Sequence, residues 1–238
     1  MANKKMIVYK HNPVIRGHFT KDDNVLTVLN EFDFDVLNSV YKITQDRYKG
    51  ILPDVYSLLE LKRFSCVELK KILNINSKRY VELIKESLQN IFDVSIVLKN
   101  YIDPVHGNKI ENYQTRILGE LGFNKEEDIN IIYLSFTAPL MTSILRRKSN
   151  YTAVDLKKTR EIKSKYGKRL YEHLLSLKGF RNEFTLRVDD LNKLFGFEET
   201  SIRRFNQILS RCYESVNNKI SFSYESHTRD KCISFIIS

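Results

Sequence analysis

Residues 188–237 read VDDLNKLFGFEETSIRRFNQILSRCYESVNNKISFSYESHTRDKCISFII. Apolar residues recur at helical spacing in two consecutive stretches, and the short segment between them contains Gly196. Alternation of apolar and polar residues then indicates a pair of strands. Two helices joined by a tight turn and followed by a β-hairpin are typical of a winged-helix domain. The expected elements are helices over 188–195 and 201–216, with Thr200 as N-cap of the second, and strands over 219–224 and 231–237.

The same order of elements occurs earlier in the chain. Before the quoted stretch, residues 164–177 form an amphipathic pattern that ends near Gly179, which favours a helix with a glycine after its last turn. We therefore predict an α+β fold of two tandem winged-helix domains, a first domain over 1–142 and a second over 143–238. In the first half the expected helices cover 31–47, 65–73 and 78–92, the expected strands cover 95–101 and 129–136, and turns are expected at Gly50, Pro53 and 104–107.

Each copy taken alone also fits other interpretations. The order of elements is common among small α+β modules, and winged helices also serve as protein-protein modules. Residues 101–128 are long for a simple wing. The repetition of the whole order favours the tandem winged-helix fold over an unrelated module.

Charge is distributed unequally between the two halves. The 238 residues include 39 Lys and Arg against 29 Asp and Glu, a formal net charge of +10. Residues 1–142 hold 19 basic and 18 acidic residues, whereas 143–238 hold 20 and 11. An isolated basic run is usually a solvated helix face, but this excess extends over a whole half. It indicates a polyanionic partner, and nucleic acid is favoured because no amphipathic membrane pattern is present.

The expected helix over 201–216 presents basic and amide side chains opposite its apolar stripe. Arg204, Gln207 and Arg211 share this outer face, and Arg203 lies beside them. Arg can bond guanine and Gln can bond adenine in the major groove, so this helix is a candidate base reader. An ordinary solvated face would carry interspersed Glu, as the expected helix over 78–92 does.

The remaining candidate DNA contacts are basic or hydroxyl side chains in the joining segment, before the reader helix, in the wing and in the first domain. The segment joining the two domains is interpreted as neutralising phosphates, which positions the protein without specifying a sequence. The expected turn of the wing carries side chains suited to phosphate or minor-groove contact. An ordinary polar hairpin turn is an equally good interpretation of the same residues. The candidates are Lys157, Lys158, Arg160, Lys163, Lys165, Lys168 and Arg169 in the joining segment, Thr200 and Ser201 before the reader helix, Arg229 and Lys231 in the wing, and Lys78, Arg79 and Lys85 in the first domain.

Catalysis and cofactor binding are not expected. The sequence has no His-x-His pair, which a DNA-nicking rolling-circle enzyme would need to hold its metal ion. It also has no G-x-x-x-x-G-K-[ST] loop, which argues against ATP hydrolysis. Its 3 cysteines are far apart, which excludes a disulfide framework and a paired zinc motif. No stretch is long and apolar enough for a membrane span. We predict a cytoplasmic, non-enzymatic protein without metal or cofactor.

The second half resembles iteron-binding plasmid replication initiators. The resemblance is carried by SKYGKRLYEHLL at 164–175, VDDLNKLFGF at 188–197, IRRFNQILSRCYESVNNK at 202–219 and KCISFII at 231–237. The match is close over about the last third of the chain. The first domain resembles the family mainly in the order of its elements. The resemblance implies that backbone contacts come from the joining segment and base contacts from the helix over 201–216.

The resemblance also implies partners. Initiators of this family form dimers through the first domain, and the dimers repress their own promoter at an inverted repeat. Monomers bind direct repeats in the origin, help to open adjacent A·T-rich DNA and recruit the host helicase machinery. A tandem winged-helix transcriptional repressor and a winged-helix interaction scaffold remain alternatives.

Overall fold

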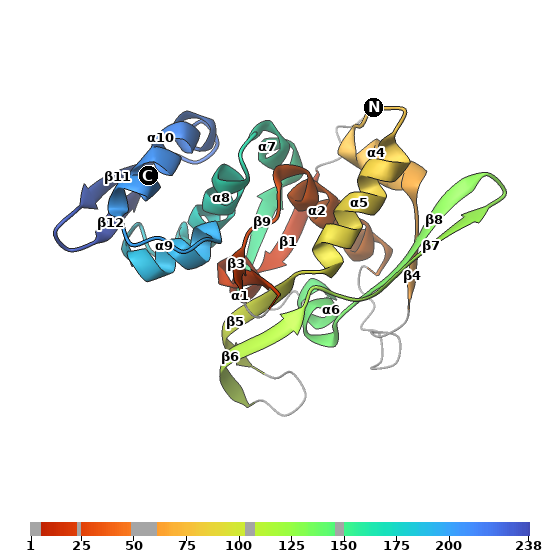
Figure 1. Ribbon diagram of the computed structural model, residues 1–238, viewed down its shortest axis with the longest axis horizontal. Helices are drawn as coiled ribbons and strands as arrows, with labels where there is room; N and C mark the ends of the chain where they lie inside the picture. The colour runs from red at the N-terminus through yellow and green to blue at the C-terminus, as the bar shows by residue number, and fades with distance from the viewer. Residues whose placement is uncertain (1–5, 23–24, 49–60, 103–107, 146–149) are drawn as a thin grey trace.

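The molecule is elongated, with two units lying side by side along its long axis (Figure 1). In this view the second unit lies at the left and the first unit at the right, and α7 and α8 lie between them. The computed structural model describes residues 6–22, 25–48, 61–102, 108–145 and 150–238. The turns expected at Gly50, Pro53 and 104–107 lie outside the described residues.

The second unit has the elements expected of a winged helix. Its sheet is antiparallel in the order β10-β12-β11. The predicted strand start at residue 219 is wrong, because the chain after α10 continues in a turn in which the N–H groups of Lys219 and Ile220 both bond the carbonyl of Val216. The elements are α8 (Lys165–Leu177), β10 (Glu183–Arg187), α9 (Val188–Phe195), α10 (Ile202–Asn217), β11 (Phe222–His227) and β12 (Cys232–Ile237).

The first unit repeats this arrangement. Its wing sheet is antiparallel in the order β4-β8-β7, which corresponds strand for strand to β10-β12-β11. The hairpin of β7 and β8 extends well beyond the body of the unit (Figure 1). The fold is therefore the predicted tandem winged helix. The elements are α2 (Glu31–Arg47), β4 (Lys62–Ser65), α4 (Cys66–Leu73), α5 (Tyr80–Phe92), β7 (Leu118–Glu126) and β8 (Ile129–Phe136).

The two helix-turn-helix segments match in detail. Both α4 and α9 are 8 residues long, and each ends at a residue in the left-handed region, Asn74 at φ 55° and Gly196 at φ 70°. Such a residue closes the last helical turn and redirects the chain into the next helix. Leu69 and Leu191 occupy corresponding positions and are both 0% exposed. Two different sequences thus build one turn from a shared pattern of burial and backbone conformation.

A second sheet explains the unusual length of residues 101–128. It consists of β2 (His18–Lys21), β3 (Val25–Thr27), β5 (Ser95–Ile102) and β6 (Lys109–Arg116), in the order β3-β2-β5-β6. The hairpin of β5 and β6 is thus inserted between α5 and the wing, and the strand expected over 95–101 belongs to this sheet. Tyr101 and Tyr113 stack across the hairpin with ring centroids 4.5 Å apart.

The N-terminal segment packs between the two units. The elements β1 (Ile7–His11) and α1 (Asn12–Arg16) were not expected from the sequence, and β1 pairs antiparallel with β9 (Tyr151–Asp155). The predicted domain boundary between 142 and 143 lies inside α6 (Ala138–Leu145). We propose that the first unit extends through β9 and α7 (Leu156–Glu161) and that the second begins at α8.

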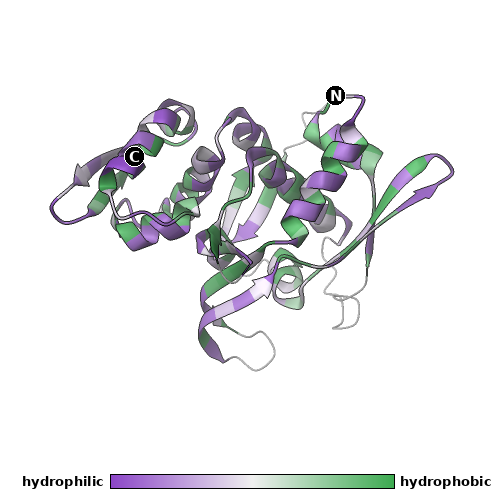
Figure 2. Ribbon diagram, viewed as in Figure 1, coloured by the Kyte–Doolittle hydropathy of each residue, from purple (hydrophilic) through white to green (hydrophobic). Residues whose placement is uncertain are grey.

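The helices are amphipathic and bury their apolar faces. Apolar positions, drawn green, lie on the buried sides of α5 and α10, and polar positions, drawn purple, lie on the exposed sides (Figure 2). Helix α8 in addition buries the polar side chains of Lys168, Arg169 and Glu172. Burial of the apolar faces supplies the main favourable free energy of folding. None of the helices within the described ranges has the length and apolarity that crossing a bilayer requires.

Candidate nucleic-acid interface

The orientation of α10 is set by its apolar stripe. Phe205, Leu209 and Val216 are 0% exposed, and Ile202 and Cys212 are nearly as buried. Their spacing of three or four residues places them on one side of the helix. The opposite side is consequently presented to solvent.

The outer face of α10 carries the four predicted reader side chains. Arg203, Arg204, Gln207 and Arg211 are all exposed. The guanidinium Nη1 of Arg204 lies 3.4 Å from Oε1 of Gln207, so these two side chains lie together one turn apart. This face offers guanidinium and amide donors and an amide acceptor, which is the chemistry used to read base edges.

The start of α10 differs from the expectation. The predicted N-cap Thr200 is wrong: the helix starts at Ile202, and the hydroxyl of Ser201 accepts the N–H of Arg203 at 3.3 Å. A serine one residue closer to the helix is placed to accept this N–H, which leaves Thr200 outside. Thr200 and Ser201 are both exposed.

A carboxylate that the sequence analysis did not single out lies at the same helix start. Oε1 of Glu199 accepts the N–H groups of Thr200 and Ser201 at 2.8 and 3.0 Å. These two bonds, with a smaller effect from Arg204, hold the pKa of Glu199 below its ordinary value. An anion of the chain itself therefore already occupies this helix start, where the backbone N–H groups favour negative charge.

The wing turn presents two of the predicted basic residues. Arg229 and Lys231 are exposed between β11 and β12. Lys231 has φ 49°, and its carbonyl accepts the N–H of Val188 at 3.2 Å, which ties the turn to the start of α9. The wing and the helix-turn-helix are therefore held in a fixed relation.

Some of the predicted DNA contacts in the joining segment are exposed, and others are half-buried. Lys157, Lys158 and Lys163 are exposed. Lys165 is half-buried, with its ammonium 5.1 Å from the ring centroid of Tyr166. Arg160 is half-buried beside Asp35 and Asp155, and burial lowers its pKa.

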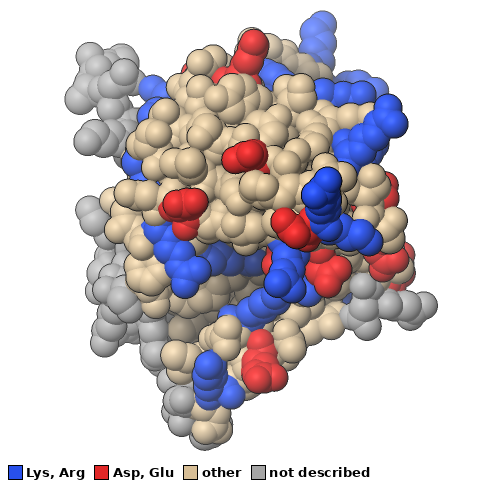
Figure 3. Space-filling model, turned by 90° about the vertical axis from the view of Figure 1, so that its left-hand side faces the viewer, with Lys and Arg blue, Asp and Glu red and all other residues tan. Residues whose placement is uncertain are grey.

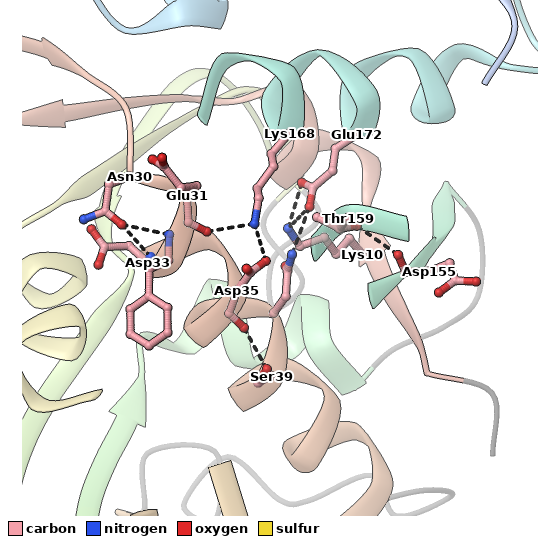
Figure 4. A network of polar contacts seen from close by, with 12 residues as sticks. Lys10, Asn30, Glu31, Asp33, Asp35, Ser39, Asp155, Thr159, Lys168 and Glu172 are labelled. Carbon is pink, nitrogen blue, oxygen red and sulfur yellow. Dashed lines mark hydrogen bonds and ion pairs between the residues drawn. The ribbon is translucent and has the colours of Figure 1, made fainter. Parts of the chain in front are cut away.

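Two predicted phosphate contacts are wrong. Lys168 and Arg169 are 1% and 2% exposed. The ammonium of Lys168 donates to Oδ1 of Asp35 at 2.5 Å and to the carbonyl of Glu31 at 2.9 Å (Figure 4). The face of α8 that carries these residues packs against the first unit, so its cations neutralise groups of this chain instead of DNA.

Arg169 connects the two units through backbone carbonyls. Its guanidinium donates to the carbonyls of Ile15 at 2.8 Å and Gly17 at 2.5 Å, both in the first unit. Burial lowers the pKa of Arg169 to about 10, although nearby Glu172 acts in the opposite direction. A buried guanidinium is stabilised when its donors have such fixed acceptors.

Glu172 completes a buried network that sequence patterns did not indicate. Its two carboxylate oxygens accept the ammonium of Lys10 at 2.9 and 2.8 Å, and Asn38 donates to one of them at 3.2 Å (Figure 4). Lys10 belongs to β1 and Asn38 to α2, so the network joins three elements distant in sequence. Burial lowers the pKa of Lys10, and its pairing with Glu172 opposes that shift.

The predicted contacts of the first unit lie at the start and along one side of α5. Lys78 and Arg79 are exposed at its start. Lys85 is half-buried, with its ammonium 5.3 Å from the ring centroid of Phe123 in the wing. Glu82 and Glu86 are exposed on the same helix, so α5 is less suited than α10 to approach DNA closely.

The end of the molecule formed by the second unit has mixed charge. In the view from this end, which also includes the lower part of the first unit, Lys and Arg side chains lie along the upper right edge and in the lower half, and Asp and Glu side chains lie among them (Figure 3). Within the described ranges, no three His, Cys, Asp or Glu side chains gather in a way that could hold a metal ion.

Solved structures share this fold. The chain is similar to the Pi initiator protein in complex with iteron DNA, with 16% sequence identity, coverage of 100% of this chain and 99% of that chain, and a TM-score of 0.55. It is also similar to RctB domains 2 and 3, with 13% identity, coverage of 92% and 84%, and a TM-score of 0.51. A comparison with curated proteins finds no match.

The two winged-helix units, joined through a buried helix, place the protein in the class of tandem winged-helix proteins. The family model described as "Initiator Replication protein, WH1" matches residues 7–175. The chain belongs to this family. The match starts within the first strand and ends inside α8, so it includes the whole first unit, for which the sequence analysis relied on layout alone.

Proposed function

We propose that this initiator binds directly repeated sites in a double-stranded replication origin, with α10 reading bases in a major groove. The observation that carries the proposal is the exposed face of α10, where Arg203, Arg204, Gln207 and Arg211 have no competing acidic row. The similarity to an initiator solved with iteron DNA supports it.

Phosphate contacts are proposed for the exposed or partly exposed basic residues around α10. Six such residues would release counterions on binding, so the logarithm of the binding constant should fall with the logarithm of salt concentration at a slope of about −5. They are Lys157, Lys158, Lys163 and Lys165 in the joining segment and Arg229 and Lys231 in the wing.

The remaining steps of initiation are proposed from the family. We infer that monomers bind the direct repeats and help to open adjacent A·T-rich DNA, and that the helicase machinery of the host is recruited there. Dimers formed through the first unit would repress the initiator's own promoter at an inverted repeat. All these steps are binding events in the cytoplasm and require no catalytic residue of this chain.

Two other functions predict different behaviour. A transcriptional repressor would use the same reader helix but recognise only an inverted repeat at a promoter. A protein-interaction scaffold would show little dependence of binding on salt concentration. The basic outer face of α10 favours the two DNA-binding functions over the scaffold.

The decisive experiment selects binding sites for the purified protein from a random duplex pool at near-physiological salt. Enrichment of one long site that occurs as tandem direct repeats beside an A·T-rich tract supports the initiator. Enrichment of an inverted repeat alone supports the repressor. The absence of any enriched site, together with a flat salt response, contradicts the proposed reading of DNA by α10.

A further inference from the structure

A hollow of about 750 Å³ lies at the junction of the two units, apart from α10 and the wing turn. Its walls come from α1, β5 and β9 on one side and from the end of α8 and the residues after it on the other. The volume is in the range of about 300–1,000 Å³ that is typical of binding pockets. The DNA-binding proposal assigns no role to this hollow.

The charged side chains that line the hollow are all cationic. They are Arg16, Lys99 and Lys178, and within the described residues no Asp or Glu is part of the lining. Just outside it, Asp190 lies 3.8 Å from Lys99 in an exposed pair. Such a lining favours a ligand that carries negative charge.

Further positive charge lies beside the hollow. Arg16 donates through Nε to the hydroxyl of Ser176 at 3.0 Å, which fixes its guanidinium at the wall. Burial, and then the neighbouring Arg181, lower the pKa of Arg16. An anionic ligand would relieve the repulsion between these two guanidinium groups.

Apolar surface accompanies the charge. Phe180 is 75% exposed and lies at the rim, and Pro13 and Leu175 contribute to the walls. An aromatic side chain so exposed next to a polar hollow is typical of surfaces that anchor a protein partner.

A strand also lines the hollow. Tyr151, Thr152 and Ala153 of β9 line the hollow, and in the described part of the chain β9 has a single strand neighbour, β1. An extended peptide can lie along such a strand, with its side chains entering the hollow.

The position of the hollow separates it from the proposed DNA contacts of the second unit. Its α8 wall lies at the end of the sheet where Asn182 accepts the N–H of Ile237. The wing turn lies at the other end of the same sheet, where Arg187 pairs with Cys232. Lys163 and Lys165 likewise lie at the opposite end of α8.

We propose that this hollow is a docking site for an extended acidic peptide segment of a partner protein, one in which carboxylates flank an apolar side chain. The carboxylates would pair with Arg16, Lys99 and Lys178, and the apolar side chain would pack on Phe180. The site spans both units, so the bound segment contacts the first and the second unit at once.

The test uses the full chain and a fluorescent synthetic peptide in which Asp and Glu alternate with Leu and Phe. A matched peptide carries Lys and Arg in place of the acidic residues. We expect saturable binding of the acidic peptide alone, and chemical-shift changes at Lys178, Gly179 and Phe180. Lys178→Glu and Phe180→Ser each should weaken binding by about tenfold or more, whereas Lys71→Glu, an exposed lysine on α4, should not.

Three results overturn the proposal. The first is that the acidic peptide does not bind, and the second is that the basic peptide binds equally well. The third is that single-stranded or random duplex DNA displaces the acidic peptide, which would identify the hollow as a nucleic-acid surface. Measurement of duplex binding by the same variants separates this test from that of the proposed function. Lys178→Glu and Phe180→Ser should retain the DNA affinity of the original protein.

Discussion

The ammonium of Lys168 lies 2.5 Å from Oδ1 of Asp35, and this ion pair joins α8 to α2 across the junction of the two units. The Lys168 side chain is 1% exposed and that of Asp35 is 16% exposed. The pair lies in the interior of the protein, as do Arg169 and Glu172 on the same helix. The relative placement of the two units therefore depends on buried polar contacts.

Replacement of Lys168 should reduce stability. Lys168→Met leaves the mostly buried Asp35 carboxylate without its cation, and loss of one partner of a buried pair costs about 3 kcal/mol. Urea unfolding should show this loss in the free energy of unfolding. The double variant Lys168→Met with Asp35→Leu should recover much of it, because the uncompensated charge is removed as well. A phosphate contact would instead give unchanged stability and a shallower salt dependence of DNA binding.

Gly196 should tolerate a side chain less well than Gly179. Both have positive φ, at 70° and 80°, so alanine at either position incurs a backbone strain of about 1 kcal/mol. A Cβ at Gly179 meets nothing within 4 Å, whereas a Cβ at Gly196 would lie 2.1 Å from the carbonyl oxygen of Thr27 in β3.

Gly196→Ala should therefore cost clearly more free energy of unfolding than its matched control Gly179→Ala. The excess reports the close approach of the second helix-turn-helix to the first unit. Equal costs for the two variants in urea unfolding would show that this approach is loose in solution.

Arg204→Ala should affect specificity. If Arg204 bonds a base edge, its loss costs about 1–3 kcal/mol on the selected site and relaxes the preference at one base pair. Competition binding with single-base variants of the site measures both effects. Arg181→Ala, an exposed arginine at the far end of the same unit, is the control and should leave affinity unchanged. Equal weakening on all sequences would identify Arg204 as a phosphate contact.

Lys158→Ala should weaken binding to the selected site and to random duplex by the same factor. Removal of one phosphate contact should also reduce the magnitude of the salt slope by about 0.9. Lys109→Ala in the β6 strand serves as a charge-matched control that lies outside the proposed interface. If both lysine variants behave alike, the exposed face of α7 does not contact DNA.

Acid should destabilise the protein partly through His173. Burial, and then the proximity of Arg169 and Arg16, lower the pKa of His173 to about 3 from an ordinary value of 6.5. Between these values the unfolded chain binds a proton that the folded chain does not, so stability falls as pH decreases. The maximum slope for one group is about 1.4 kcal/mol per pH unit.

The variant His173→Leu should remove this contribution. Its free energy of unfolding should fall less steeply than that of the original protein between pH 6 and pH 4. His18, whose pKa is lowered to about 4 by burial and by nearby cations, should leave part of the dependence in this variant. An unchanged slope in His173→Leu would show that its ring is hydrated in solution.

Sequence alone indicated the repeated part of the fold. The helices over 31–47 and 188–195 and the strand over 129–136 occur with the predicted bounds, because local apolar periodicity and caps define them. The outward face of α10 followed from the same periodicity. The N-terminal strands and the pairing of β1 with β9 could not be predicted in this way, because the partner strands are distant in sequence.

Local pattern determined the helices of the two repeated winged-helix units and which face of α10 is basic. The tertiary structure decided which of the basic residues reach solvent. Lys163 and Lys168 lie within five positions of each other, yet the first is exposed and the second is buried against Asp35. The physical reason is that burial of a charge depends on an acceptor supplied from elsewhere in the chain, and no local pattern contains that partner.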